Sequence, residues 1–325
     1  VVDIVIGTHA LIQEGVRFGR LAVAVVDEQH RFGVHQRVML RDKASDHDPD
    51  LLIMTATPIP RTLSMTLYGD LDVSVLDELP PGRRPVTTRH VPKDPESLEG
   101  VYRLVRSEAA EGRQSFVVCP LVEDSTKMEA KSASAEYERL KSVYPDLRLG
   151  LLHGQMRPSE KDEVMHRFRA GDLDILVATT VIEVGIDVPN ATVMVIEDAD
   201  RFGLSQLHQL RGRVGRGADA ATCLLVAEPK TSDGEERIAA MVATTDGFRL
   251  AEEDMRIRGQ GTVFGARQSG MTDLRLADLL RDVDSLIAAR REAFALVQRD
   301  PDLGNHPELA EEVQALLGED AEWLE

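Results

Sequence analysis

The stretch DILVATTVIEVGIDVPNATVMVIED, residues 174–198, contains two apolar runs of strand length on either side of a loop. The runs cover residues 174–180 and 191–198 and are rich in Val, Ile and Ala. Short apolar runs of this kind are typical of strands in a parallel sheet that is covered on both faces. The stretch therefore predicts two buried strands joined by a loop.

Runs of the same kind occur along most of the chain. The other predicted strands are residues 1–8, 21–27 and 50–56, with 71–78 as one more candidate, and residues 115–122, 147–154 and 221–228. Helical segments fit between them, such as 35–44 and 159–171, the second opened by Pro158 and closed by Gly171. This alternation predicts the α/β class with parallel sheets, and a length of 325 residues predicts about two domains.

The proline- and arginine-rich stretch LPPGRRPVTTRHVP, residues 79–92, is the strongest candidate for a domain boundary. Its simplest role is that of a surface linker. Because it has arginines and no acidic residue, it could contact phosphate as well. From residue 233 onward the strand pattern stops. We predict a first α/β domain at 1–79, a linker at 80–95, a second α/β domain at 96–230, a helical segment at 231–275, and a carboxyl-terminal helical segment with an acidic tail at 276–325.

The composition limits the classes of function. A net charge of -18 argues against wholesale electrostatic binding to nucleic acid or anionic membrane, although a local basic groove remains compatible with it. Arginine outnumbers lysine, which fits bidentate phosphate contacts or a GC-rich genome. Cys119 and Cys223 have no metal-ligand spacing, and no apolar run approaches the roughly 20 residues that cross a bilayer. We expect two reduced thiols in a cytoplasmic protein.

The sequence VVDEQH places two carboxylates directly after the predicted strand 21–27. The carboxyl ends of parallel strands are where α/β folds bind ligands. Hydrolysis of a nucleoside triphosphate needs an anionic ligand for Mg²⁺ and a group that orients the attacking water. We predict that Asp27 holds Mg²⁺ and that Glu28 polarises the water. The alternative is a pair of surface carboxylates at an ordinary strand-to-loop junction.

The sequence TATPIPRT, residues 55–62, follows the next predicted strand. Small hydroxyl residues before two prolines form a rigid turn beside the carboxylates. We predict that Thr55 and Thr57 bond to the carboxylates and report the nucleotide state to the second domain. The alternative is an ordinary Thr/Pro turn.

The sequence QLHQLRGRVGR, residues 206–216, contains three arginines and no acidic residue. Arg213 and Arg216 are three positions apart, so on a helix they would share a face. Two guanidinium groups on one face suit a triphosphate, and Gln209 belongs to the same predicted nucleotide contact. We expect this site to be completed when the two domains close. The alternative is a basic helix on a DNA or RNA backbone.

The loop ATTVIEVGIDVPNA, residues 178–191, lies between the two strands of the opening stretch. Thr179 and Thr180 can donate hydroxyl hydrogen bonds to a nucleic-acid backbone. Gly185 and Asp187 mark a turn that could approach the nucleotide. The alternative is a plain loop between two buried strands.

Taken in order, these sequences resemble motifs II, III, V and VI of the superfamily 2 helicases. RFGVHQR at 31–37, TATPIPRTL at 55–63 and DGFRLAEEDMRIRGQGTVFGARQSG at 246–270 are similar to the RecG family of branch-migration helicases and to transcription-repair coupling translocases. The tetrad DEQH favours RecG. The resemblance implies two tandem RecA-like motor domains, the first one truncated, followed by a translocation hairpin at 231–275 and carboxyl-terminal helices.

The resemblance also implies ATP and Mg²⁺ as cofactors and branched double-stranded DNA, such as forks and Holliday junctions, as the partner in DNA repair and recombination. It implies a monomer, with single-stranded DNA-binding protein as a further partner. Further implied site residues are Gln29 and His30 for coupling, and Thr8, His9, Arg256, Arg258, Arg267 and Gln268 for nucleic-acid binding, with Gly7 beside the first pair. Residues 255–275 contain four arginines against one aspartate, which predicts a basic patch or, alternatively, a solvated hairpin.

A phosphate-binding loop needs lysine after glycine, and none of the lysines in the sequence follows a glycine. The Walker A motif is therefore missing. We expect the chain to be the carboxyl-terminal portion of a RecG-like protein, without its wedge domain, and to hydrolyse ATP poorly by itself. The alternatives are a transcription-repair coupling translocase, a non-catalytic nucleic-acid-binding protein that retains helicase motifs, and an RNA helicase.

Overall fold

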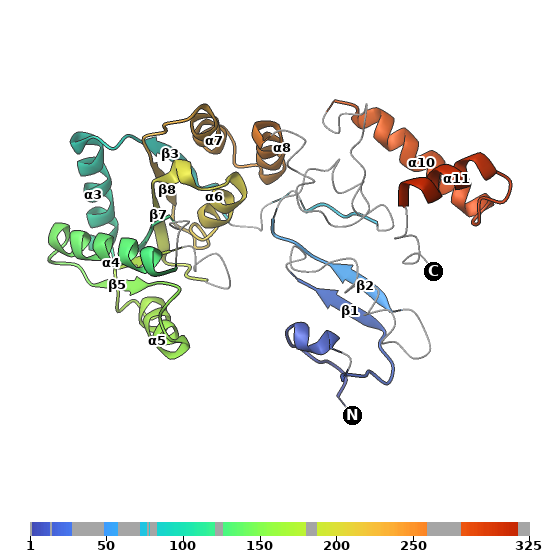
Figure 1. The fold of residues 1–325 in the computed structure, drawn as a ribbon. Coiled ribbons are helices and arrows are strands. Elements are labelled where there is room, and N and C mark those ends of the chain that lie inside the picture. The colour runs from blue at the N-terminus through green and yellow to red at the C-terminus, as the bar shows by residue number, and fades with distance from the viewer. Residues whose placement is uncertain are drawn as a thin grey trace. The chain divides into compact units, whose positions relative to one another are not determined.

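The computed structural model describes residues 2–13, 15–27, 49–57, 72–76, 78, 83–120, 126–179, 187–258 and 281–317. The chain divides into two compact units, Val1–Pro58 and Ile59–Glu325, whose elements are labelled in Figure 1. The predicted helix at 35–44 lies outside the described residues.

The first unit contains a short 3-10 helix, η1 (His9–Ile12), and two parallel strands, β1 (Val23–Val26) and β2 (Asp50–Ile53). The side chains of Ile12, Ala24 and Val26 form its small buried core. The strands predicted at 21–27 and 50–56 are thus confirmed. The strand predicted at 1–8 is wrong for residues 2–8, which lie without strand pairing and expose most of their apolar side chains.

The second unit is built on a six-stranded parallel sheet in the order β3-β8-β7-β4-β6-β5. Its strands are β3 (Thr87–Val91), β4 (Gln114–Val118), β5 (Leu149–Leu152), β6 (Ile175–Ala178), β7 (Ala191–Glu197) and β8 (Thr222–Val226). Five of them confirm the predicted strands of the second half. The sixth, β3, lies within the range predicted as the 80–95 linker and pairs with β8 along its whole length. The candidate strand at 71–78 forms none at the described residues 72–76 and 78.

Helices cover both faces of this sheet (Figure 1). They are α3 (Pro95–Ala110), α4 (Thr126–Val143), α5 (Pro158–Arg169), α6 (Leu204–Arg211), α7 (Ser232–Ala243) and α8 (Gly247–Arg258), with the short η4 (Ala199–Arg201) after β7. One buried cluster joins the sheet to α5, α6, α7 and α8, and another joins it to α3 and α4. The α5 helix confirms the prediction at 159–171, and both faces of the sheet are covered as predicted.

The central strand β4 shows how the sequence builds both cores. Phe116 and Val118 lie in the cluster with α5 to α8, whereas Val117 and Cys119 lie in the cluster with α3 and α4. Successive side chains of a strand point to opposite faces, so a continuous apolar run is buried on both. Phe116 meets the Phe168 ring of α5 edge-on, with ring centroids 5.0 Å apart.

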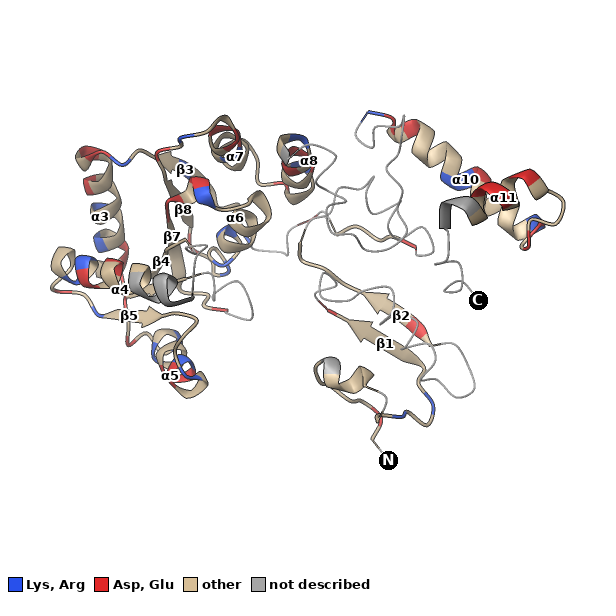
Figure 2. Ribbon diagram, viewed as in Figure 1, with Lys and Arg blue, Asp and Glu red and all other residues tan. Residues whose placement is uncertain are grey.

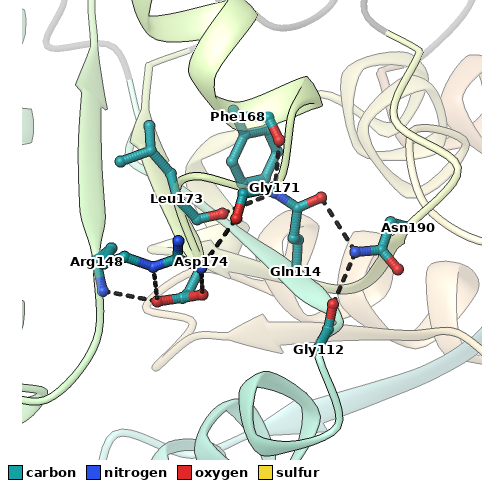
Figure 3. A network of polar contacts seen from close by, with 8 residues as sticks. All are labelled: Gly112, Gln114, Arg148, Phe168, Gly171, Leu173, Asp174 and Asn190. Carbon is teal, nitrogen blue, oxygen red and sulfur yellow. Dashed lines mark hydrogen bonds and ion pairs between the residues drawn. The ribbon is translucent and has the colours of Figure 1, made fainter.

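Polar contacts close the amino-terminal edge of the sheet (Figure 3). Gln114 is buried, and its Nε2 donates to Phe168 O at 2.6 Å and to Leu173 O at 2.7 Å. Asn190 Nδ2 donates to Gly112 O at 2.8 Å and to Gln114 Oε1 at 3.3 Å. These bonds join the start of β4 to the end of α5 and to the loops before β6 and β7. The loops at this edge are therefore tied together.

A bidentate ion pair adds to the same edge. Arg148 Nη2 lies 2.6 Å from Asp174 Oδ1, and Arg148 Nε lies 3.1 Å from Asp174 Oδ2. The same guanidinium donates to Gly171 O at 2.9 Å. This contact lowers the pKa of Asp174, against the opposing effect of burial.

The carboxyl-terminal segment contains α10 (Val283–Arg299) and α11 (Pro307–Leu317). The α10 and α11 helices lie within the carboxyl-terminal segment, 276–325, that was predicted to be helical. The turn between the two helices is held by Asp300, whose Oδ2 accepts from the Asn305 backbone N–H at 2.9 Å and lies 2.8 Å from His306 Nδ1. Among the described residues, no helix has the length and apolar character needed to cross a membrane. Cys119 and Cys223 are both free and buried, as expected.

Candidate nucleotide and nucleic-acid sites

In the first unit, β1 and β2 end at the same edge of their sheet. Val26 pairs with Ile53, and the Met54 N–H donates to Val26 O at 2.8 Å. Asp27, which follows β1, and Thr55, which follows β2, are therefore brought to one edge, and both are exposed. The structure thus places these two predicted site residues side by side along the strand ends, while Glu28, Gln29 and His30 lie outside the described residues.

The threonines after β2 form a local turn. Thr55 Oγ1 accepts a hydrogen bond from the Thr57 backbone N–H at 3.1 Å. This is the ordinary turn that the sequence left open as an alternative. The bond from Thr55 to a carboxylate stays a prediction.

The chemistry of Asp27 fits a magnesium ligand. Mg²⁺ is usually held by one or two carboxylates together with waters and substrate phosphates, not by a cage of protein ligands. An exposed carboxylate at a strand end offers such a ligand. Within the described ranges there is no group of three or more His, Cys, Asp and Glu residues suited to a metal ion.

In the second unit, the predicted arginine helix ends earlier than expected. The α6 helix stops at Arg211, Gly212 is its carboxyl cap, and Gly215 has a φ of +70°. Arg213 and Arg216 therefore lie in a turn, and the prediction that they share a helical face is wrong. Glycine at and beyond a helix end allows backbone conformations that break the helix. We call residues 212–217 the arginine loop.

The arginine loop packs closely against neighbouring backbone. The Gly215 N–H donates to Ala191 O at 3.4 Å, and Val214 is fully buried. A Cβ atom on Gly215 would lie 3.0 Å from Val86 Cγ2, and one on Gly217 would lie 2.6 Å from Pro189 O. Both glycines are thus required by space, and Gly215 by its φ as well.

Two of the predicted nucleotide residues meet at this loop. Arg216 Nη1 donates to Asp187 Oδ1 at 3.1 Å, and Arg216 Nε donates to Gly212 O at 3.3 Å. Arg83, from the predicted basic linker, also donates to Gly212 O, at 3.2 Å. Arg213 and Gln209 are partly buried on the same segment. Gly185 lies outside the described residues.

Among the predicted nucleic-acid contacts, Thr179 is less exposed than expected. Thr179 follows β6 and is fully buried. Its N–H donates to Leu152 O at 3.2 Å, which continues the pairing of β6 with β5. Thr179 is therefore not at the surface, and its contact with a nucleic-acid backbone stays a prediction. Thr180 lies outside the described residues. In the first unit, Thr8 is exposed and precedes η1, and the His9 side chain is outside the description.

The basic patch predicted at 255–275 is described only at its start. Arg256 Nη2 lies 2.6 Å from Glu236 Oε2 of α7, and Arg256 Nε lies 2.8 Å from Glu253 Oε2 on its own helix. Figure 2 shows both signs of charge on α8. Arg256 is thus balanced by two carboxylates that lie outside the range counted for the patch. The Arg258 side chain, Arg267 and Gln268 lie outside the described residues.

Sequence reasoning missed a group of charges at the end of β7. Lys93 forms an ion pair with Asp198, whose φ is +48°. Burial, with a further contribution from the nearby Glu136 carboxylate, raises the pKa of Glu197 to about 7. The sequence did contain a signal for this group of charges, because the apolar run that forms β7 ends in two acidic residues, VIED. The same pattern indicated Asp27 and Glu28 as site residues.

The raised pKa of Glu197 predicts a pH-dependent stability. The unfolded carboxyl ionises near its ordinary value of 4.5, whereas the folded one keeps its proton to about 7. The free energy of unfolding should therefore fall as pH rises from about 4.5 to about 7, by roughly 3 kcal/mol at most. Glu197→Gln should remove this slope, measured by urea unfolding at pH 5 and pH 8. Glu163→Gln, an exposed change on α5, is the matched control, and an unchanged slope in Glu197→Gln would contradict the assignment.

Comparisons with known proteins place the chain in a family. The family model "Helicase conserved C-terminal domain" matches residues 96–218, and the model "ATP-dependent DNA helicase RecG, domain 3, C-terminal" matches residues 244–318. ATP-dependent DNA helicase RecG of Bacillus subtilis is 50% identical over 300 residues, which are 92% of this chain and 43% of that protein. RecG of Escherichia coli K12 is 50% identical over 303 residues, which are 92% of this chain and 44% of that protein.

A solved structure agrees with these relatives. The structure of RecG bound to a three-way DNA junction has a TM-score of 0.66 and 48% identity, and the match covers 87% of this chain and 36% of that one. The helicase MrfA bound to DNA has a TM-score of 0.50 at 20% identity and shares the fold. The chain spans less than half the length of the curated relatives that it matches, and over that span it is similar to the RecG family of DNA helicases.

Proposed function

We propose that the chain is part of an ATP-dependent double-stranded DNA translocase that remodels stalled replication forks and branch-migrates Holliday junctions. The observation that carries the proposal is the 48% identity, over 87% of the chain, to a RecG protein whose structure was solved on a three-way DNA junction. Branched double-stranded DNA is the partner that this similarity supports. We propose a cytoplasmic monomer, with single-stranded DNA-binding protein as a further partner.

The proposed chemistry is ATP hydrolysis with Mg²⁺. Asp27 would hold the metal ion and Glu28 would orient the attacking water, because both follow strand β1 in the sequence. Arg213 and Arg216 would contact the phosphates, with Gln209 beside them. The nucleotide would carry the phosphate bond that is cleaved, and the metal ion would help to activate that bond. The side chains would orient the attacking water and stabilise the negative charge that develops on the phosphate.

The ion pair between Arg216 and Asp187 suggests how the arginine loop receives a nucleotide. Arg216 has a planar fork of donors that suits a phosphate as well as a carboxylate. In the structure Asp187 Oδ1 takes one of these donors at 3.1 Å. We propose that phosphate oxygens replace Asp187 on Arg216 when nucleotide binds, and that Asp187 then faces another part of the nucleotide, as does Gly185.

The remaining assignments complete the proposal for DNA. Thr55 and Thr57 would couple the nucleotide site to the second unit, together with Gln29 and His30. Thr8, His9, Thr179, Thr180, Arg256, Arg258, Arg267 and Gln268 would contact DNA or support the segment that does. Hydroxyls and backbone amides make many of the contacts between proteins and nucleic-acid backbones, so a protein of net charge -18 can still bind DNA through local groups.

A comparison of the 325-residue chain with its full-length parent tests the proposal. The parent should hydrolyse ATP in response to forked DNA and regress forks, whereas the 325-residue chain should turn over ATP at least about 100-fold more slowly, because electrostatic stabilisation of phosphates is the main source of catalysis and the lysine that follows glycine is missing. Both are measured by phosphate release with and without forked DNA. Equal turnover would refute the inactivity of the chain, and a parent that ignores branched DNA would refute the proposed function.

A further inference from the structure

Arg211, the last residue of α6, is a buried cation that reaches across to another helix. Its side chain is only 3% exposed. Nη1 donates to Met241 O at 3.1 Å and to Thr244 O at 2.8 Å, and Nη2 donates to Thr245 O at 3.3 Å. These carbonyls belong to the end of α7 and to residues 244–246, which connect α7 to α8 and which we call the α7–α8 junction.

The charge of Arg211 is balanced by backbone dipoles. Within the described part of the chain, no carboxylate forms an ion pair with it, and burial lowers its pKa from the ordinary arginine value. The last carbonyls of α7 are the negative end of that helix, where an arginine can cap the free acceptors. A buried charge held only by such bonds loses its compensation if either partner moves, so the contact favours one relative position of α6 and the junction.

Two further contacts fix the direction of the guanidinium. Nη2 lies 3.0 Å from His208 Nδ1, one turn back on α6. Burial and the neighbouring Arg211 lower the pKa of His208 to about 4, so at neutral pH the ring is uncharged and Nδ1 can accept this bond. Nη1 also lies 3.4 Å from Thr88 Oγ1 of β3. Arg211 thus contacts α6, β3 and the junction at once.

Arg211 directly precedes the arginine loop. Gly212, the carboxyl cap of α6, follows it directly, and the Val214 N–H donates to Arg211 O at 3.4 Å. On the other side, the junction is continuous with α8, whose first turn is held by Asp246, because Asp246 Oδ1 accepts from the Phe248 N–H at 2.8 Å. The α6 and α8 helices also pack directly against each other. One side chain therefore joins the backbone of the arginine loop to the start of α8.

We propose that Arg211 is a positioning residue that couples the arginine loop to the α7–α8 junction, so that a shift of the loop on nucleotide moves α8 with it. The proposal rests on the proposed function, in which Arg213 and Arg216 respond to nucleotide. Arg211 would not contact the nucleotide. Its loss would lower the number of base pairs regressed per ATP, which we call the yield, more than it would lower the rate of ATP hydrolysis.

The first experiment measures that yield in the full-length parent. Arg211→Met keeps an unbranched apolar stem and removes the donors. It should leave DNA-stimulated ATP turnover within about threefold of the parent and lower the base pairs regressed per ATP about 10-fold, a typical coupling between two sites. Arg211→Lys restores a cation and should recover part of the yield. A fall of ATP turnover and fork regression in equal proportion would overturn the proposal.

Arg106→Met is the matched control, because Arg106 lies on α3, outside the predicted translocation hairpin. It also donates to a carbonyl of another helix, with Nη2 at 2.9 Å from Val143 O of α4. It should keep the parental yield per ATP. An equal loss of yield in Arg106→Met would show that the loss of any arginine contact between helices has the same effect, which overturns the specific role of Arg211.

A second readout does not depend on the enzyme's activity. In the 325-residue chain, amide hydrogen exchange at residues 212–217 and at 244–247 should speed up together in Arg211→Met and stay at the original rate in Arg106→Met. If only one of the two segments changes, the coupling is absent. This result would separate a failure of the coupling from a failure of the proposed function, which the turnover of the unmodified parent decides.

Discussion

Replacing Arg216 by alanine in the full-length parent should lower DNA-stimulated ATP turnover by about 10³-fold or more, the range in which an arginine on the transferred phosphoryl group acts. The Arg216 side chain is 31% exposed and holds Asp187 at 3.1 Å, so a phosphate can reach it by replacing one anion with another. Its planar fork of donors fits phosphate oxygens. Arg213→Ala should have an effect of similar kind, because Arg213 belongs to the same loop.

The measurement is ATP turnover at saturating forked DNA, with nucleotide binding followed separately. Arg148→Ala is the control, because Arg148 precedes β5 and its guanidinium bonds to Asp174 and to Gly171 O, not to the arginine loop. It should keep parental turnover. If Arg216→Ala also stays within threefold of the parent, Arg216 does not contact the phosphates and the assignment of the arginine loop fails.

Apart from the runs at 1–8 and 71–78, which form no strand at their described residues, strands with continuous apolar runs were predicted well from the sequence, and the one polar strand was missed. The runs that became β6 and β7 are buried on both faces of the sheet, so their composition alone marks them. In contrast, β3 reads TTRHV, is only partly buried, and lies at the edge of the sheet. Its pairing with β8 gives it its structure. That partner is far away in the sequence, and the preceding prolines and arginines indicated a linker instead.

Residue types at the candidate sites were predictable, but their geometry was not. The glycines at 212 and 215 are helix-ending signals, yet the three-residue spacing of the arginines was given more weight and led to a helical face that does not exist. The bonds from Arg211 to the end of α7 connect positions about thirty apart, and the pair of Arg256 with Glu236 connects two helices. Contacts of this range depend on the packed fold, so local patterns could not reveal them.

The largest effect on stability is expected from Phe116→Ala in the second unit. Phe116 is fully buried on β4, which lies between β6 and β7, and its ring meets Phe168 of α5 edge-on. Removing a buried phenyl ring leaves a cavity as well as lost apolar burial, and typically costs about 3–5 kcal/mol. Since a domain is stable by only about 5–15 kcal/mol, this one change should remove a large part of the unit's stability.

Because the chain has two units, a single unfolding curve would mix their transitions, and amide hydrogen exchange at β6 and β7 is the better measurement. Phe116→Ala should speed exchange at these strands by two orders of magnitude or more, the equivalent of about 3 kcal/mol. Phe294→Ala is the control, since Phe294 is 44% exposed on α10 and its loss should cost less than about 1 kcal/mol. Equal exchange rates in the two variants would mean that the ring of Phe116 does not lie in the core. The same pair of variants also tests whether the sheet that carries the arginine loop is a single cooperative unit, because exchange should then rise at β8 as much as at β6 and β7.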